Sequence, residues 1–240
     1  MKYKIGWVVL FFFYSTGLTL ASEKIDQIEN LSQDEFKRLS ENIGAAVSYK
    51  AVIPVEPLGI TGFDVGIAVT GTEFNEDDLW QRATSSGSAP STLYVPRLYA
   101  HKGLPFGIDI GAFYSELPDA DLTLWGAEVR YAIWEGGVAA PALGIRATTT
   151  QLSGLSQFEI STLGVDIGIS KGFTLLTVYG GAGVQRVESE VNLSSFNSED
   201  FFQKRLYAGL SISLLLINLG VEYDITGDVN SLSVKAGLRF

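Results

Sequence analysis

The ionisable and nucleophilic residues of this 240-residue chain limit the chemistry it could perform. The sequence contains one histidine, His101, and no cysteine. A thiolate nucleophile, a thiolate zinc site and a disulfide framework are therefore excluded. A serine–histidine mechanism would have to use His101, which we expect in a turn beside Lys102 and Gly103, with no Ser or Asp at strand spacing. The sequence thus predicts no catalytic, cofactor-binding or metal-binding residue.

The acidic residues recur in a short pattern, glycine–x–aspartate–x–glycine, which begins at Gly62, Gly107 and Gly164. In an extended chain every second side chain lies on the same face, so each aspartate shares a face with two glycines. The interpretation we favour is a barrel wall whose acids point inward between glycines that leave room for them. The alternative is a ligand or cation site, which would require the acids to converge at one height.

Residues 1–21 have the organisation of a secretory signal peptide. Lys2 and Lys4 precede an apolar stretch over residues 5–14, and small residues end at Ala21. The product is therefore expected outside the cytoplasm. The whole chain holds 17 basic and 27 acidic residues, a net charge of −10, so no nucleic-acid partner is expected, because such proteins need a basic face.

Hydrophobic residues beyond the leader alternate with polar or small residues, which indicates strands with one apolar face. The last eleven residues show this most clearly, because Leu232, Val234 and Ala236 alternate with serine and lysine, and the chain ends on Leu238 and Phe240. Glycines are frequent inside these segments. Soluble sandwiches rarely carry so many glycines inside strands.

The alternating last strand, the terminal Phe240 and the signal peptide together resemble bacterial outer-membrane β-barrels. The resemblance covers roughly residues 60–240 and implies a transmembrane antiparallel up-and-down barrel. It also implies that Leu238 and Phe240 form the signal that the barrel assembly machinery reads. No narrower family is indicated.

Ten strands fit the alternation over residues 60–240, an even number, as bacterial single-chain barrels require. We expect them near residues 60–72, 91–101, 105–116, 122–134, 138–150, 157–171, 173–187, 203–214, 216–226 and 230–240. The short connections are expected on the periplasmic side and most of the longer ones on the outside. A twelve-stranded barrel is the alternative, if residues 45–52 form a further strand with another before it.

Residues 22–59 differ from the barrel and are expected to form a helix followed by extended chain. Ser32 and Glu35 make a capping box, and Phe36, Leu39 and Ile43 share one helical face. The segment is predicted to lie either in the periplasm or inside the barrel as a plug.

Strand alternation places a balanced set of charges inside the barrel, the lumen charge network. A ten-stranded barrel with paired charges inside is expected to be mostly closed, because pairing offsets the cost of removing each ion from water. Its predicted members are Asp64, Arg97, Asp109, Glu128, Arg130, Arg146, Asp166, Glu222, Asp224, Lys235 and Arg239.

Two prolines, Pro96 and Pro141, fall inside predicted strands, where each would remove a hydrogen-bond donor from the sheet. One interpretation is a bulge or a misplaced strand end. The other is a lateral opening through which an apolar molecule passes between lumen and bilayer.

These observations predict an integral outer-membrane protein in contact with outer-membrane lipid and lipopolysaccharide. The leading functional interpretation is a non-enzymatic barrel, either structural or binding a small apolar or lipid ligand. A narrow ion or solute channel is one alternative, and a lipid-modifying enzyme that uses carboxylates is another. No cofactor is expected.

Overall fold

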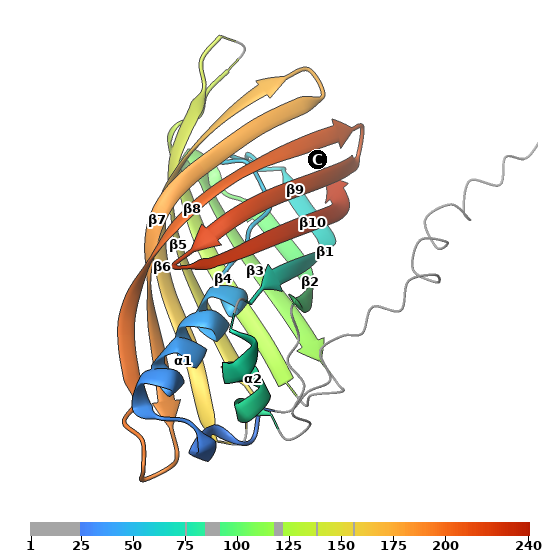
Figure 1. Ribbon diagram of the computed structural model, residues 1–240. Coiled ribbons are helices and arrows are strands. Elements are labelled where there is room, and N and C mark those ends of the chain that lie inside the picture. The colour runs from blue at the N-terminus through green and yellow to red at the C-terminus, as the bar shows by residue number, and fades with distance from the viewer. Residues whose placement is uncertain (1–24, 75, 85–91, 118–121, 138, 156) are drawn as a thin grey trace, which may run out of the picture.

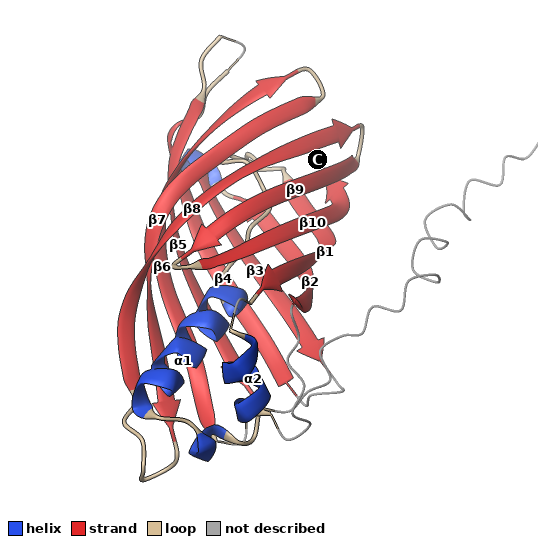
Figure 2. Ribbon diagram, viewed as in Figure 1, coloured by secondary structure: helices blue, strands red, loops and turns tan. Residues whose placement is uncertain are grey.

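The computed structural model describes residues 25–74, 76–84, 92–117, 122–137, 139–155 and 157–240, so the predicted signal peptide lies outside the described residues. Ten antiparallel strands form a closed barrel, which confirms the predicted fold class (Figures 1 and 2). The strands are β1 (Phe63–Glu73), β2 (Thr92–Gly103), β3 (Ile108–Leu117), β4 (Leu122–Trp134), β5 (Ala142–Ser153), β6 (Phe158–Phe173), β7 (Leu176–Val191), β8 (Glu199–Leu214), β9 (Ile217–Thr226) and β10 (Val229–Arg239).

Each strand pairs with its neighbours in sequence, and β1 pairs with β10 to close the barrel. The connections after β2, β4, β6 and β8 lie at one end, with the C-terminus, and we call this the turn end. The connections after the odd-numbered strands lie at the other end, the loop end. Several predicted boundaries are wrong by a few residues. The predicted strand at 138–150, for example, is β5, which begins only at Ala142.

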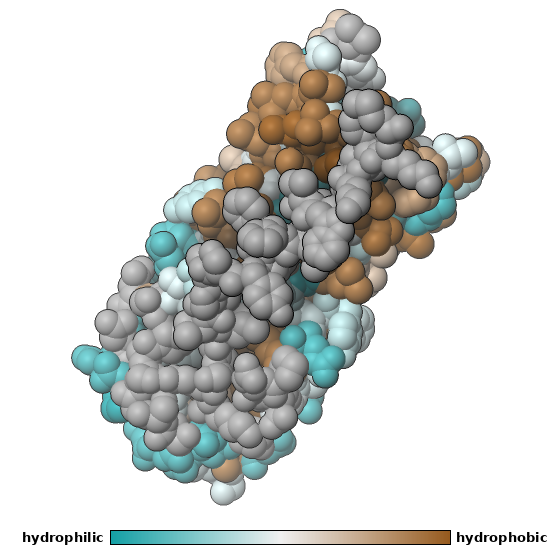
Figure 3. All heavy atoms as spheres, turned by 90° about the vertical axis from the view of Figure 1, so that its right-hand side faces the viewer, coloured by the Kyte–Doolittle hydropathy of each residue, from teal (hydrophilic) through white to brown (hydrophobic). Residues whose placement is uncertain are grey.

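The outward face of the strands is apolar and exposed. Alternating side chains of β6 illustrate it, because Leu163, Val165, Ile167 and Ile169 are each about half exposed, at 49–59%. Figure 3 shows hydrophobic residues gathered toward the turn end and hydrophilic residues toward the loop end. Apolar side chains that face outward from a closed barrel match the hydrocarbon of a bilayer. No helix in the described part of the chain is long and apolar enough to cross a membrane.

Helix α1 (Gln33–Val47) lies within the barrel at the loop end, where it contacts β2, β5 to β8 and β10 (Figure 1). Its start follows the predicted capping box, because the Ser32 side chain accepts from the Glu35 backbone N–H and the Glu35 carboxylate accepts from the Ser32 N–H. The predicted apolar face is buried, with Phe36, Leu39 and Ile43 at most 2% exposed. A helix inside a barrel this narrow must bury nearly all of one face.

Three smaller elements complete the fold. A 3-10 turn, η1 (Ile28–Asn30), precedes α1, and the short helix α2 (Asp77–Ala83) packs beside η1 and α1 in the connection between β1 and β2. A second 3-10 turn, η2 (Pro105–Gly107), joins β2 to β3.

An extended segment, residues 48–58, leads from α1 toward the turn end, and we call it the strap. Residues 48–55 are all buried although none belongs to a strand or helix. Residues 45–47 end helix α1 instead of starting a strand, so the twelve-stranded alternative is wrong. Helix and strap together occupy the lumen from the loop end to the beginning of β1.

Candidate functional site

The six acids of the lumen charge network face the lumen and are at most 5% exposed. Four of them contact predicted basic partners on the wall, and the longest of these contacts, 3.6 Å, joins Glu128 to Arg146. The Asp64 carboxylate lies 2.6 Å from Lys235 Nζ, Asp109 lies 2.6 Å from Arg130, and Asp166 lies 2.9 Å from Arg146. Pairing of this kind is what permits charges to stay buried.

Two cations of the lumen were not among the predicted members. Arg205 on β8 binds both Glu222, at 3.0 Å, and Asp224, at 2.5 Å. Lys50 on the strap also pairs with Asp224 and is fully buried. The alternation of Arg205 and Tyr207 with Leu206 and Ala208 could have revealed Arg205, although Lys204 interrupts the apolar face. No strand pattern could have placed Lys50 inside the barrel.

The charged residues of the wall also bind the backbone of the plug, by which we mean helix α1 and the strap. Arg97 donates to the carbonyl of Ala46 at 2.8 Å, Arg205 to that of Tyr49 at 2.7 Å, and Arg130 to that of Pro54 at 2.9 Å. Asp109 accepts from the backbone N–H of Leu58 at 3.1 Å. An extended chain outside a sheet cannot satisfy its own backbone groups, and buried backbone groups left unpaired are costly. The network therefore holds the strap in place as well as neutralising itself.

Two predicted members of the lumen charge network, Arg97 and Arg239, have contacts other than an ion pair with an acid. Arg97 binds one of the last carbonyls of α1 and lies 4.8 Å from the centre of the Phe113 ring, so it caps the helix C-terminus. Arg239 is half-buried at the turn end, opposite Asp64 in the register of β1 and β10. The terminal residues Leu238 and Phe240 are exposed on the outer face, and Phe240 packs on Phe63 with ring centres 3.9 Å apart.

The predicted location of His101 is wrong, because it lies in β2 and faces the lumen with 2% exposure. Its Nε2 lies 3.3 Å from the Tyr49 hydroxyl of the strap and 3.5 Å from the Glu128 carboxylate. Gly111 on β3 makes room for the ring, since a Cβ at Gly111 would stand 2.2 Å from a ring carbon. At this position the glycine of the repeated pattern accommodates an imidazole together with an acid, because Cγ of Glu128 would stand 2.9 Å from the same Cβ.

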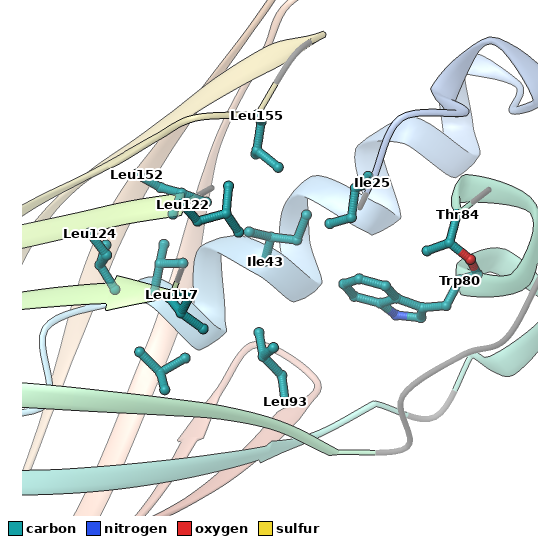
Figure 4. Close-up of a pocket in the computed structure, with 12 residues that line it drawn as sticks. Ile25, Ile43, Trp80, Thr84, Leu93, Leu117, Leu122, Leu124, Leu152 and Leu155 are labelled. Atoms are coloured by element: carbon teal, nitrogen blue, oxygen red, sulfur yellow. The ribbon is translucent and has the colours of Figure 1, made fainter. Parts of the chain in front are cut away.

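The loop-end half of the barrel contains an apolar cavity between α1, α2 and the inner faces of β2 to β5 (Figure 4). Its volume is about 50 Å³. Figure 4 shows side chains that converge on it from the helices and the strands. The lining residues are Ile25, Ile43, Val47, Trp80, Thr84, Leu93, Val95, Leu117, Leu122, Leu124, Leu152 and Leu155.

Sequence patterns did not predict this cavity. The strand leucines that line it face inward from segments that also carry inward polar residues, such as Ser115 and Glu128. Alternation therefore marks these leucines only as inward. The contribution of α1 and α2 depends on tertiary packing, which no local pattern encodes.

The two prolines occupy different environments. Pro96 lies within β2, opposite Val69 of β1, as predicted. Pro141 lies just before β5 and is exposed, so its predicted position inside a strand is wrong and it removes no hydrogen bond from the sheet. Of the two prolines, Pro96 therefore lies inside a strand and Pro141 does not.

Comparisons with known proteins found no matching protein family and no matching curated sequence. The translocator domain of autotransporter NalP from Neisseria meningitidis is 12% identical, with 86% of this chain and 95% of that chain covered and a TM-score of 0.37. The KdgM porin is 10% identical, with coverages of 75% and 99% and a TM-score of 0.36. Ail of Yersinia pestis is 11% identical, with coverages of 75% and 97% and a TM-score of 0.30.

At these TM-scores the likeness carries no argument about function, and the class of protein follows from the geometry itself. A closed antiparallel barrel with an apolar exterior and a charged interior is the architecture of bacterial outer-membrane proteins. This chain is an integral outer-membrane β-barrel protein with a plugged lumen.

Proposed function

We propose that this barrel binds a small apolar or lipid ligand in the cavity at the loop end, without chemical conversion of the ligand. The observation that carries the proposal is the cavity itself, whose lining is apolar except for Thr84 and the indole N–H of Trp80. Binding sites for small molecules are concave, mostly apolar and supplied with few polar groups. An apolar solute gains free energy when it leaves water for such a site.

Trp80 narrows the chemistry of the ligand. Its side chain lines the cavity and is 3% exposed, and its indole N–H has no acceptor within the described part of the chain. A buried donor without a partner costs free energy that a ligand oxygen could recover. A hydrocarbon chain that ends in a carboxylate, ester or hydroxyl oxygen therefore fits the site.

The strap supports this proposal over the narrow-channel alternative. Residues 48–55 are buried across the lumen, and Arg205 and Arg130 on the wall bind their backbone at Tyr49 and Pro54. An ion that crossed the lumen would have to displace these contacts.

Fluorescence titration with dansyl-labelled undecanoic acid tests the proposed site. The double variant Leu124→Phe/Leu152→Phe fills the cavity and is expected to weaken binding about tenfold or more, a loss of about 1.4 kcal/mol. Leu163→Phe on the exterior is the matched control, because Leu163 is 59% exposed, and should bind as the wild type does. Mobility of unboiled and boiled samples on a detergent gel reports whether each variant has folded.

Equal binding by the filled variant and the wild type would contradict the proposal. If the filled variant does not fold, Trp80→Phe provides the test. It removes the indole N–H along with part of the ring, and it should weaken the carboxylate probe more than a dansyl-labelled undecane that lacks the carboxylate, because the change in volume affects both probes alike. Equal weakening of both probes would contradict the role of the N–H.

A further inference from the structure

We propose that the seam between β2 and β3 is a lateral portal through which the ligand passes between the cavity and the bilayer. This inference rests on the proposed function and adds the route. The portal is bounded by Val95–Arg97 on β2 and Ser115–Leu117 on β3.

The hydrogen-bonded ladder is shortest at this seam. β2 and β3 share six residue pairs, from Leu98↔Tyr114 to Gly103↔Asp109. The other nine seams hold between ten and sixteen pairs. The barrel is therefore held least firmly where these two strands meet toward the loop end.

Neither strand has frayed where the ladder stops. Val95 still pairs with Thr70 of β1, and Leu117 still pairs with Leu122 of β4. Continued in the same register, β2 and β3 would place Pro96 opposite Glu116. Proline has no N–H to donate and is tolerated only where a ladder bond is missing, so Pro96 explains locally why pairing ends there.

The cavity reaches the unpaired stretch from the inside. Val95 and Leu117, which would be opposite each other in the continued register, both line the cavity. Ser115, two residues from Leu117 on the same face, is 3% exposed, and its hydroxyl has no partner among the described residues. A molecule that left the cavity between β2 and β3 would thus cross no intact hydrogen bond of the sheet.

The outside of the seam lies at the border of the apolar exterior. Leu98 on β2 is 56% exposed, Tyr114 on β3 is 47% exposed, and Trp125 beside it on β4 is also 47% exposed. Tyrosine and tryptophan side chains of barrels gather at the membrane–water interface. With the short turns on the periplasmic side, as the sequence predicts, the portal opens at the outer leaflet, which makes an outer-leaflet acyl chain the ligand class.

A reversible disulfide across the seam tests the route. Because the native chain has no cysteine, no other thiol can react with the introduced pair. Pro96→Cys/Glu116→Cys locks the seam, and Thr149→Cys/Leu163→Cys, a directly opposed outward pair of β5 and β6, is the matched control. The measurement is stopped-flow transfer of dansyl-labelled undecanoic acid from phosphatidylcholine vesicles to the barrel reconstituted in liposomes. Oxidation should slow uptake in the first variant about tenfold or more, without changing the final amount bound, because only the route is blocked.

Reduction should restore the rate in the seam variant, and the control should be unaffected in both states. Equal rates in the locked and reduced seam variant would overturn the portal and favour entry from the loop end past Trp80. Absence of probe binding in every protein, including the wild type, would instead overturn the proposed function. If the disulfide does not form, Pro96→Val provides the test of the portal. It restores the backbone donor, so uptake should slow about threefold. An unchanged rate would overturn the portal.

Discussion

The two halves of the lumen are built from opposite chemistry. Toward the turn end, buried acids and bases pair with one another and bind the strap, as Asp224 does with Lys50 and Arg205. Toward the loop end, the apolar face of α1 packs on apolar wall residues, and Phe36 meets Phe158 with ring centres 5.6 Å apart. Both halves fill a barrel, but only the apolar half leaves a cavity next to an incompletely paired seam.

The difference reflects what each kind of contact requires. Charged groups and extended backbone need partners at fixed distances, so the turn-end half is specified by individual hydrogen bonds. Apolar packing is not directional and can rearrange around a ligand at modest cost. The charged half therefore suits closure of the barrel, and the apolar half suits binding.

The largest effect is expected when an acid is removed from the charged half. Asp224→Ala leaves Lys50 unpaired and Arg205 with one acidic partner. Breaking a buried ion pair from one side is strongly destabilising, so we expect a loss of about 4 kcal/mol in the free energy of unfolding. Urea titration of the detergent-solubilised protein, followed by tryptophan fluorescence, measures it.

Asp200→Ala is the matched control for this variant. Asp200 on β8 pairs with Arg186 on β7. As in the pair of Asp224 with Arg205, the acid lies two residues away from the residue directly opposite the arginine. Both side chains of the control pair are about half exposed. Exposed ion pairs contribute little because water and salt screen them, so this variant should unfold almost as the wild type does. Equal losses of unfolding free energy in the two variants would show that the buried ion pairs contribute no more to stability than the exposed pair does.

A smaller loss is expected when the apolar half is enlarged. Leu152→Ala removes a buried side chain that lines the cavity and should cost about 3 kcal/mol in unfolding free energy. The same change gives the ligand more space, so a dansyl-labelled fatty acid longer than undecanoic acid should bind more tightly than it does to the wild type. Stability and binding would then move in opposite directions, which no variant of the charged half should do.

An intermediate test concerns the tight packing where the two halves meet. Gly111→Ala would place its Cβ against the buried His101 ring, and overpacking of this kind typically costs about 2 kcal/mol. Gly137→Ala is the control, because nothing lies within 4 Å of a Cβ at that position. The midpoints of urea unfolding compare the two, and equal midpoints would show that the ring moves aside freely.

Much of the charged half could be predicted from the sequence, because strand alternation assigns each wall residue to a face. The pairs Asp64 with Lys235 and Asp109 with Arg130 consist entirely of residues assigned to the inward face. The partners of Lys50 could not be found in this way, because the strap follows no periodic pattern. Its position depends on the closed wall around it.

The apolar half was less predictable for a related reason. A leucine that faces the lumen looks the same in sequence whether it packs on a helix or lines a cavity, as Leu124 and Leu152 do. Proline gave the more useful local signal, because its missing N–H has the same consequence in any sheet. Even so, only Pro96 ends a ladder, since the boundary of β5 excludes Pro141.

The smallest effect is expected for the ion pair between Glu35 of α1 and Arg82 of α2 at the loop end, which we call the tie between the two helices. Arg82 donates to both oxygens of Glu35, and together with the Ser32 backbone N–H it lowers the pKa of Glu35 from 4.5 to about 2. A lowered pKa in the folded state means that this stabilisation is present above pH 4.5 and is lost as the pH falls toward 2.

Glu35→Gln keeps an acceptor for Ser32 but removes the charge. The urea midpoint of the wild type should therefore be slightly higher than that of the variant from pH 5 to 8, and the two midpoints should converge in acid. Because the tie is exposed to solvent, the difference should shrink further in high salt. A difference that grew as the pH fell would assign the pH dependence to other carboxylates, such as Glu76 at the start of α2, which pairs with Arg38 of α1.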